Sequence, residues 1–431
     1  MNDLQLPHLN TTLIEPLHFL ERRFLSRRQE INDWFVQQWQ LTAPPVYGSV
    51  DLRNAGFKLA PIDMNLFPAG FNNLNPAFLA MTVLAAQKAI LQIMPTAKNI
   101  LLLPEGHTRN TFYWENVHIL QNILVEAGFQ VRIGTLAAEN TAQTITLSSG
   151  DEMQLSALLR EGTQLKLADF LPDVILLNND LSEGIPALLQ GLTQPVAPPP
   201  ELGWSRRLKS EHFHYYQQVA KAFAAHMEVD PWLISSLFRN CGQVDFMQQE
   251  GIDCLTHHAT ILFEEIKQKY QEYAIPYEPF LIVKADAGTY GMAVMTVRHV
   301  EELTSLNRKQ RTRMATTKGG QPVHQVIIQE GVYTFETVDA GNSVAEPVIY
   351  MWGEKVVGGF YRVHHERGID ESLNAPGMQF QPLPFSQACD NPCDEMEPDA
   401  CPNRFYVYGI VAQLSMLAAA HEMRDTDKIR N

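Results

Sequence analysis

The sequence predicts an α/β protein in which an N-terminal parallel sheet is followed by an α+β domain. Between residues 77 and 177, short apolar runs alternate with helix-length segments, a pattern typical of parallel strands joined by crossover helices. A proline-rich break, QPVAPPPE, follows at residues 194–201. At residues 280–297, two apolar runs separated by a glycine-containing turn indicate two strands joined by a loop. We therefore expect two domains, at residues 1–200 and 201–431.

The composition is that of an ordinary globular protein, because 45% of the 431 residues are hydrophobic and 19% are charged. The formal net charge of −15 argues against sequence-independent nucleic-acid binding, which needs a basic face. We expect a small-molecule partner instead. The N-terminal segment MNDLQLPHLNTTLIEP has neither a basic start nor an apolar core, so we expect no secretory signal, no membrane segment and a cytoplasmic protein.

The five cysteines are expected to be reduced thiols in such a protein. Cys389, Cys393 and Cys401 share one acidic loop. Three thiols without a nearby histidine make an incomplete zinc set, so we do not expect a structural zinc there.

Each predicted element has a simple sequence signal. Helix-period apolar residues between positions 11 and 40 predict one or two surface helices. The α/β part is then predicted to contain a helix at 77–94, a strand at 99–103, a helix at 111–127, and strands at 129–133 and 174–177. The charge-free stretch 406–420 predicts a buried C-terminal helix, since it is too short to span a bilayer.

Polar clusters follow two of the predicted parallel strands. They are PEGHTRN at residues 104–110, which contains His107 and Arg109, and NNDLSEG at residues 178–184. Ligands of parallel sheets bind beyond the carboxyl ends of the strands, so both clusters are candidates for the edge of a site. Helix capping and surface charge are the alternative for His107 and Arg109 taken singly.

Residues 46–76 form a polar, turn-prone stretch with interleaved apolar anchors. It is either a solvated loop or the lining of a polar ligand site, and the anchors favour the lining. An amino-acid substrate needs a cation for its carboxylate and an acceptor for its ammonium. Arg53 or Lys58 together with Asp63 supplies both. The candidate substrate-binding residues of this stretch are Arg53, Asn54, Lys58, Asp63, Asn65 and Asn72.

The segment FLIVKADAGTYGMAVMTV at residues 280–297 predicts a strand, a flexible loop and a second strand. Lys284 ends the first strand, and Gly288, Thr289 and Gly291 lie in the loop. A strand-borne lysine under a glycine-rich loop can hold a triphosphate, because the glycines let backbone N–H groups approach phosphate oxygens. The alternative is an ordinary hairpin with Lys284 in solvent.

The helix predicted after residue 205 begins with Arg206, Arg207 and Lys209. Positive side chains at a helix N-terminus oppose the helix dipole, at a cost of about 0.3–1 kcal/mol each, unless an anion offsets it. A phosphate would be such an anion. The alternative is a solvated basic patch.

Lys209, Lys284 with its glycine loop, and VIIQEGV at residues 326–332 follow in an order that resembles the ATP-grasp ligases. The resemblance implies a pre-ATP-grasp-like N-terminal domain followed by an ATP-grasp-like domain. It further implies an adenine-binding hinge at Gln329, Glu330 and Gly331, with Gln329 offering backbone groups to adenine and Glu330 near the ribose. It places Arg362 at a phosphate-facing position and Asn374 near the transferred phosphate. Candidate Mg²⁺ ligands are Glu346, Glu371 and Asn374.

Longer sequence motifs point to one family more specifically than these single residues do. SVDLRNAGFKLAPIDMNLFPAGFNNLNPAF, PEGHTRNTFY, VKADAGTYGM and GGFYRVH with NAPGMQF resemble the proteobacterial type of glutamate–cysteine ligase. This resemblance implies ATP and Mg²⁺ as cofactors, L-glutamate and L-cysteine as substrates, and an acyl-phosphate intermediate in the first step of glutathione synthesis. The chain departs from the ATP-grasp pattern beyond Phe380, where an acidic loop and a helix replace a metal-binding strand, and at Val348, where an arginine is usual.

Two other functions stay open. One is a different ATP-dependent carboxylate–amine ligase, for example a glutathione synthetase-like enzyme, and the other is a nucleotide-binding regulatory protein without turnover. A dinucleotide dehydrogenase is disfavoured, because no GxGxxG opens a helix after a strand.

Overall fold

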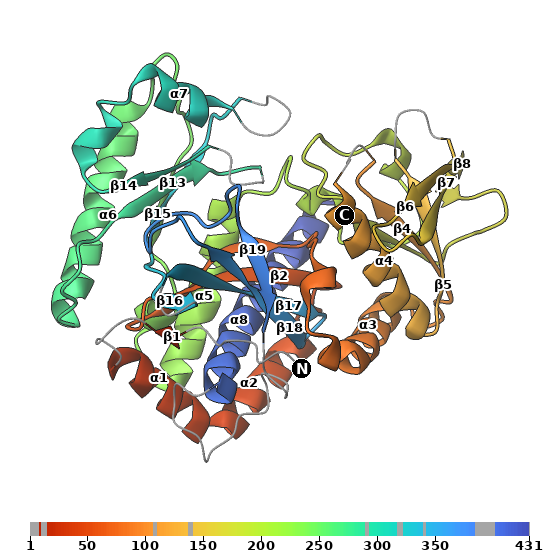
Figure 1. Ribbon diagram of the computed structural model, residues 1–431, viewed down its shortest axis with the longest axis horizontal. Coiled ribbons are helices and arrows are strands. Elements are labelled where there is room, and N and C mark those ends of the chain that lie inside the picture. Colours follow the sequence, from red (N-terminus) through yellow and green to blue (C-terminus); the bar gives the residue numbers. More distant parts are fainter. Residues whose placement is uncertain are drawn as a thin grey trace.

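The computed structural model describes residues 8–9, 15–106, 110–136, 141–288, 293–316, 322–338, 342–383 and 401–430. Within them the chain has a mixed α/β fold with three main sheets. Figure 1 shows a central sheet flanked at one end by the sheet of β4, β5 and β7 and at the other by the sheet of β13, β14 and β15. The site described below lies where these three parts meet.

The central sheet has seven strands, all paired antiparallel, in the order β1-β16-β17-β18-β19, with β2 paired to β17 and β3 paired to β2. Its strands are β1 (His8–Leu9), β2 (Tyr47–Asn54), β3 (Leu59–Asn65), β16 (Glu336–Val338), β17 (Ser343–Trp352), β18 (Lys355–His364) and β19 (Gln379–Pro382). Strands from both predicted domains therefore share one sheet, and the expected division at residue 200 does not separate the sheets.

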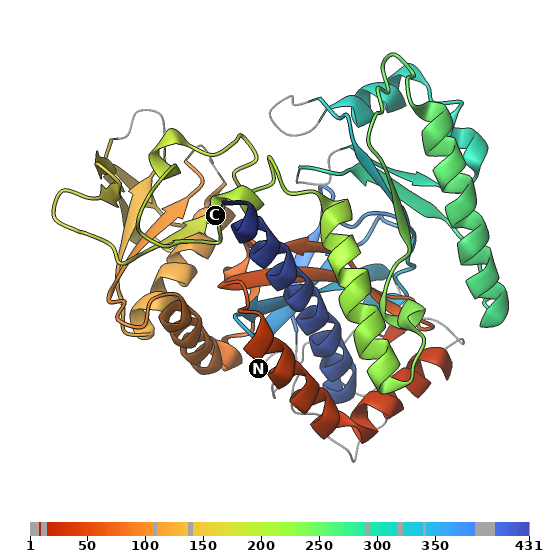
Figure 2. The same ribbon diagram turned by 180° about the vertical axis from the view of Figure 1, so that it is seen from behind.

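Helices cover one face of the central sheet, as the view from behind shows (Figure 2). They are α1 (Glu15–Ser26), α2 (Arg28–Leu41), α5 (Lys209–Met227) and α8 (Cys401–Arg430). In α8, the residues from Phe405 to Ala420 are almost all buried, which confirms the predicted C-terminal core helix. The helices α1 and α2 confirm the prediction for residues 11–40, but Leu20, Phe24 and Ile31 lie in the core, so these helices are packed rather than peripheral.

The second sheet confirms the predicted parallel architecture. Its order is β11-β10-β4-β5-β7-β6, with parallel pairs up to β7 and an antiparallel edge strand β6. The strands are β4 (Asn99–Pro104), β5 (Gln130–Thr135), β6 (Gln143–Thr146), β7 (Glu152–Ala157), β10 (Val174–Asn178) and β11 (Val196–Ala197). The crossover helices are α3 (Leu79–Ile93) and α4 (Thr111–Glu126), and a small hairpin joins β8 (Leu159–Glu161) to β9 (Gln164–Lys166).

The third sheet is antiparallel, in the order β12-β15-β13-β14. It contains β12 (Phe238–Cys241), β13 (Leu281–Ala285), β14 (Val294–Val297) and β15 (Val326–Glu330), with α6 (Ile252–Glu272) and α7 (Arg308–Ala315) beside it. Lys284 pairs with Val294 across β13 and β14, so the predicted strand–loop–strand is confirmed. Short 3-10 helices are η1 (Phe71–Asn73), η2 (Pro76–Phe78), η3 (Ala187–Leu189), η4 (Pro200–Leu202), η5 (Pro231–Ile234) and η6 (Val300–Leu303).

The polar stretch at residues 46–76 forms the hairpin β2–β3 rather than a solvated loop. Both strands are largely buried, with Val50, Leu52 and Leu59 fully enclosed. Because the hairpin is covered on both faces, its sequence lacks the alternation of a half-exposed strand. Polar side chains of this hairpin instead face the cavity described below.

One helical segment of the described chain, Pro76–Ile93, is long and apolar enough to cross a membrane by length and composition. A single such helix is weak evidence, because core helices pass the same test. Its residues Ala85, Ala86 and Ile90 pack in a hydrophobic core with the second sheet.

Candidate active site

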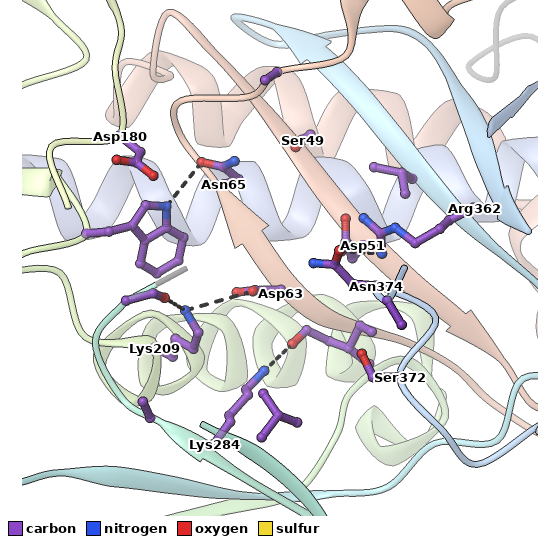
Figure 3. A pocket seen from close by; sticks show the side chains of 18 of the residues that line it. Ser49, Asp51, Asp63, Asn65, Asp180, Lys209, Lys284, Arg362, Ser372 and Asn374 are labelled. Atoms are coloured by element: carbon purple, nitrogen blue, oxygen red, sulfur yellow. Dashed lines mark hydrogen bonds and ion pairs between the residues drawn. The ribbon is translucent and has the colours of Figure 1, made fainter. Parts of the chain in front are cut away.

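A cleft with a volume of about 1360 Å³ lies between the three sheets. Its lining includes residues of β2 and β3, of β13 and β15, of β17 and β18, and of the loops that follow β4 and β10. The carboxyl edge of the parallel sheet therefore faces the same cavity as the Lys284 hairpin. Figure 3 shows Lys209, Lys284, Asp63, Asp51 and Arg362 grouped in this part of the cleft.

Lys284 and Lys209 both rest against β3. The ammonium of Lys284 donates to the carbonyl oxygen of Ile62 at 2.7 Å. The ammonium of Lys209 donates to the carbonyl oxygen of Gly288 at 2.8 Å, and it lies 3.9 Å from a carboxylate oxygen of Asp63. It also lies 3.6 Å from the centre of the Trp204 ring, a cation–π contact. Two cations are thus placed side by side beneath the start of the glycine loop.

Burial lowers the pKa of both ammonium groups, and it lowers the pKa of Lys209 to about 8, while Asp63 acts in the opposite direction on each. Burial also raises the pKa of Asp63, but Lys209 and Lys284 outweigh it and leave that pKa below its usual value. The carboxylate and the two ammonium groups therefore stabilise one another's charged forms.

Arg362 on β18 connects two carboxylates. Its Nη1 donates to Asp51 at 2.9 Å and to Glu346 on β17. Burial disfavours the charged guanidinium, but Asp51 and Glu346 raise the pKa of Arg362 above its usual value. Its Nε is buried and has no hydrogen-bond partner among the described residues. A buried, charged donor without an acceptor is a place where an anionic ligand is favoured.

Arg53 lies in the wall of the cleft, but protein groups already occupy three of its nitrogens. Nε donates to Glu346 at 3.2 Å, Nη1 donates to the carbonyl oxygen of Val332 at 3.1 Å, and Nη2 donates to the carbonyl oxygen of Glu371. The side chain joins β2 to β17 and to the segments around residues 332 and 371. This geometry is that of a brace between segments of the protein.

Lys58 and Asn54 do not line the cleft. Lys58 is enclosed with Glu330, and Nζ lies 2.8 Å from the carboxylate and 4.0 Å from the centre of the Trp232 ring. Burial lowers the pKa of Lys58 to about 8, and Glu330 opposes this. The side-chain amide of Asn54 donates to the hydroxyl of Tyr408 at 3.0 Å. Both side chains therefore hold the β2–β3 hairpin in the core, and the structure does not bring them to the site.

The predicted hinge lies along the cleft at β15. Gln329 and Glu330 line the cavity, and the side-chain amide of Gln329 donates to the hydroxyl of Ser236 at 2.7 Å. The Glu330 carboxylate accepts hydrogen bonds from Lys58, from the Trp232 indole at 3.0 Å and from the backbone N–H of Leu237 at 2.9 Å. The carboxylate is therefore already engaged by the protein, and a position of Glu330 near the ribose stays a prediction. At Gly331 an added Cβ would lie 2.2 Å from the Phe280 ring, so only glycine fits.

Asn65 and Asn72 line the cleft. The side-chain oxygen of Asn65 accepts from the backbone N–H of Phe67 at 2.8 Å and from the Trp204 indole at 3.4 Å. Asn65 therefore orients the ring that contacts Lys209. The residues His107, Arg109, Thr289 and Gly291, as well as Cys389 and Cys393, lie outside the described residues.

At Arg207, near the start of α5, the positive charge is neutralised by a carboxylate of the protein. Arg207 donates to the Glu422 carboxylate on α8 at 2.7 and 2.9 Å, and to the carbonyl oxygen of Met64 at 2.7 Å. The predicted phosphate is thus not needed at Arg207, whereas Lys209 faces the cleft. Arg207 instead fixes α8 and β3 relative to the helix that carries Lys209.

The predicted Mg²⁺ ligands Glu346, Glu371 and Asn374 all line the cleft. The Glu346 carboxylate is engaged by Arg53 and Arg362, and the Glu371 carboxylate accepts from the N–H of Gly368 at 2.8 Å and from Arg367 at 3.1 Å. No group of three or more His, Cys, Asp or Glu residues in the described chain could hold a metal ion. These side chains do not form a metal centre by themselves.

Sequence reasoning missed Ser49, Asp51 and Trp204. Ser49, Asp51 and Arg53 line the cleft from one strand, and their spacing of two residues puts them on one face of β2. Recognising residues 47–54 as a strand would have identified Asp51. Nothing in the sequence indicates that Trp204 lies over Lys209, since the two meet through a turn whose geometry the residues alone do not specify.

Comparison with known proteins identifies the family. The glutamate-cysteine ligase (GshA) family model matches residues 21–423. A protein described as a candidate gamma-glutamylcysteine synthetase from Methylobacillus flagellatus KT is 51% identical, with a TM-score of 0.91 over 98% of this chain and 100% of that chain. A comparison with curated proteins returns no match.

Two other solved structures are distant. D-alanyl-alanine synthetase A from Vibrio cholerae O1 biovar eltor is 12% identical, with a TM-score of 0.34 over 74% of this chain and 81% of that chain. A glutathione synthetase-like effector from Globodera pallida is 12% identical, with a TM-score of 0.37 over 82% of this chain and 77% of that chain. With TM-scores this low, neither structure supports a conclusion about this chain. The family match and the close relative confirm the resemblance seen in the sequence, and the chain belongs to the glutamate-cysteine ligase family.

Proposed function

We propose that this cleft joins the amino group of L-cysteine to the γ-carboxylate of L-glutamate at the expense of ATP, the first step of glutathione synthesis. The observation that carries the proposal is the grouping of Lys209, Lys284 and Arg362 around one cavity that the carboxylates of Asp63 and Asp51 also line. A nucleotide triphosphate needs such cations, and an amino acid needs both an acceptor and a donor. The family assignment supplies the identity of the substrates.

The nucleotide is proposed to lie between β13 and β15. Its phosphates would contact the ammonium groups of Lys209 and Lys284 and the backbone at Gly288, and its base would lie along Gln329. In this arrangement the third sheet acts as an ATP-grasp-like nucleotide-binding unit. The hinge would contribute backbone groups, because the Glu330 carboxylate is already engaged.

Glutamate is proposed to bind beside β3, with its ammonium at Asp63 and its γ-carboxylate near Arg362. Asn65, Asn72 and Asn374 also line the cleft and offer amide groups. A divalent cation would have to be held largely by phosphate oxygens together with one or two side chains such as Glu371 or Asn374, as is usual for Mg²⁺. We also propose a cytoplasmic location, where ATP and both amino acids are present.

The proposed chemistry has two transfers. A γ-carboxylate oxygen of glutamate attacks the γ-phosphorus of ATP, which forms an acyl phosphate and releases ADP. The cysteine amine then attacks the acyl carbon, so that a C–N bond forms, the C–O bond to phosphate breaks, and the amine loses a proton. Both steps need charge neutralisation and alignment more than a covalent protein group. Lys209, Lys284 and Arg362 supply the neutralisation, and no side-chain nucleophile is required.

Incubating the chain with ATP, Mg²⁺ and pairs of amino acids tests this function. We expect ADP, phosphate and γ-glutamylcysteine to form in equal amounts with L-glutamate and L-cysteine. Product with γ-glutamylcysteine and glycine instead would identify a glutathione synthetase-like enzyme. ATP binding without turnover for any pair would identify a regulatory protein, and either result would overturn the proposal.

A further inference from the structure

Asp63 stands between the two halves of the proposed site. It lies on β3 directly opposite Asp51 on β2, and its side chain is 38% exposed. On one side, the Lys209 ammonium lies 3.9 Å from its carboxylate, and Lys284 contacts the carbonyl oxygen of the preceding residue, Ile62. On the other side lies the Asp51–Arg362 pair. One residue thus adjoins both the proposed phosphate cations and the proposed amino-acid site (Figure 3).

The neighbouring carboxylates have partners that do not depend on the lysines. Asp51 is paired with Arg362 at 2.9 Å. Asp286, near the start of α5, accepts hydrogen bonds from the backbone N–H and the hydroxyl of Ser210 at 2.7 and 2.6 Å. The third nearby cation, Arg207, is held by Glu422. Asp63 differs from these groups, because the two cleft lysines are the cations that act on it most strongly, ahead of Arg207.

A polyphosphate changes this balance. A bound nucleotide attracts both ammonium groups, since several phosphate oxygens outweigh a single carboxylate. The two ammonium groups then no longer neutralise the Asp63 carboxylate, although this carboxylate remains partly enclosed. A partly exposed carboxylate whose neighbouring cations are engaged elsewhere binds a new cation more strongly, because the lysines no longer compete for it. The ammonium of an amino acid is the cation that the proposed reaction brings to this place.

We infer that Asp63 couples the two binding events: it neutralises Lys209 and Lys284 until ATP engages them, and only then does its carboxylate bind the glutamate ammonium. This inference rests on the proposed function and adds to it an order, nucleotide before glutamate. The coupling is reciprocal, so glutamate must tighten nucleotide binding by the same factor.

Calorimetric titration of the full chain with L-glutamate, with and without a saturating β,γ-imido analogue of ATP and Mg²⁺, tests the coupling. For the wild type we expect the analogue to tighten glutamate binding about ten-fold, and glutamate to tighten analogue binding equally. In Asp63→Asn we expect the coupling to vanish and glutamate to bind weakly with or without the analogue. The analogue alone should bind this variant more tightly than the wild type, because no carboxylate competes for the lysines.

The matched control is Asp253→Asn, which removes one exposed carboxylate from α6, outside the lining of the cleft, and should leave the coupling factor unchanged. Three results would overturn the inference: equal glutamate affinity in the wild type with and without the analogue, coupling retained in Asp63→Asn, or a loss of both affinities alike in that variant. Formation of γ-glutamylcysteine without coupling would contradict only this inference. Absence of both product and glutamate binding would overturn the proposed function as well.

Discussion

The ammonium of Lys58 lies 2.8 Å from a carboxylate oxygen of Glu330, and the two side chains are only 1% and 0% exposed. Lys58 belongs to the turn between β2 and β3, and Glu330 ends β15. The pair therefore fastens the central sheet to the third sheet at the wall of the cleft, which Glu330 lines and Lys58 does not. Trp232 covers the ammonium and donates to the same carboxylate.

Lys58→Met should destabilise the protein by about 3–5 kcal/mol, because it leaves a buried carboxylate without its cation. Urea unfolding followed by circular dichroism measures this. The matched control is Lys88→Met, which breaks a pair with Glu354 in which Lys88 is 54% exposed and should cost at most about 1 kcal/mol. A large rise in the KM for glutamate with unchanged stability in Lys58→Met would show that Lys58 serves the substrate.

Lys284→Ala should lower kcat by at least about a hundred-fold, since it removes a preorganised cation from the phosphates. Stability should change by only about 1–2 kcal/mol, because the lost protein contacts are one hydrogen bond to Ile62 and one cation–π contact with Phe213. Steady-state kinetics and a thermal melt measure the two effects. Lys221→Ala, at an exposed position of α5, is the control, and near-normal turnover in Lys284→Ala would refute the phosphate role.

Nucleotide binding should take up a proton at alkaline pH. Burial lowers the pKa of Lys209 to about 8, so above that pH the free protein holds mostly the neutral amine, whereas a bound phosphate favours the ammonium. Affinity for the imido analogue should therefore fall as the pH rises through about 8. Calorimetry at pH 8.5 in buffers of different ionisation enthalpy measures the uptake.

Lys209→Arg is the matched variant for this titration, because a guanidinium stays charged throughout the range. It should bind the analogue with little dependence on pH between 7 and 9. Wild-type affinity that stays constant over the same range would be incompatible with a functional Lys209 of lowered pKa.

Arg53→Ala should lower the melting temperature and impair glutamate and ATP alike, since Arg53 joins Glu346, Val332 and Glu371 across the cleft wall. Arg53→Lys should rescue only in part, because one ammonium cannot reach all three acceptors. The three substrate KM values and the melting curve decide the matter. A ten- to hundred-fold loss in kcat/KM for glutamate alone, corresponding to about 1.5–3 kcal/mol, with an unchanged melting temperature would instead place Arg53 on the substrate.

The parallel sheet and the Lys284 hairpin could be predicted because their signals are local. Residues 100–103 and 174–177 are continuous apolar runs, as buried parallel strands require, and the glycines after Lys284 mark a turn. The β2–β3 hairpin escaped prediction because burial on both faces removes alternation and because its polar side chains resemble a loop. Its pairing with β17 joins residues about 300 positions apart, which no local pattern encodes.

The site could be predicted by residue type better than by role. Lys209, Lys284, Arg362, Asp63 and Asn65 were all expected, and all line the cleft. Lys58 and Glu330 carry the same kinds of charged group as these cleft residues, yet they neutralise each other in the core. Which charged residues meet each other and which meet a ligand depends on tertiary packing, and a single sequence does not reveal it.

The most direct test of the proposed reaction is to follow the oxygen of glutamate. With L-glutamate labelled with ¹⁸O in the γ-carboxylate, an acyl-phosphate route transfers one labelled oxygen to inorganic phosphate for each γ-glutamylcysteine formed. Mass spectrometry of both products measures the ratio. We predict one label per phosphate in the wild type, and at most about a hundredth of the wild-type rate for both products in Lys284→Ala. Unlabelled phosphate accompanying γ-glutamylcysteine, or label found in AMP, would contradict phosphoryl transfer to glutamate in this cleft.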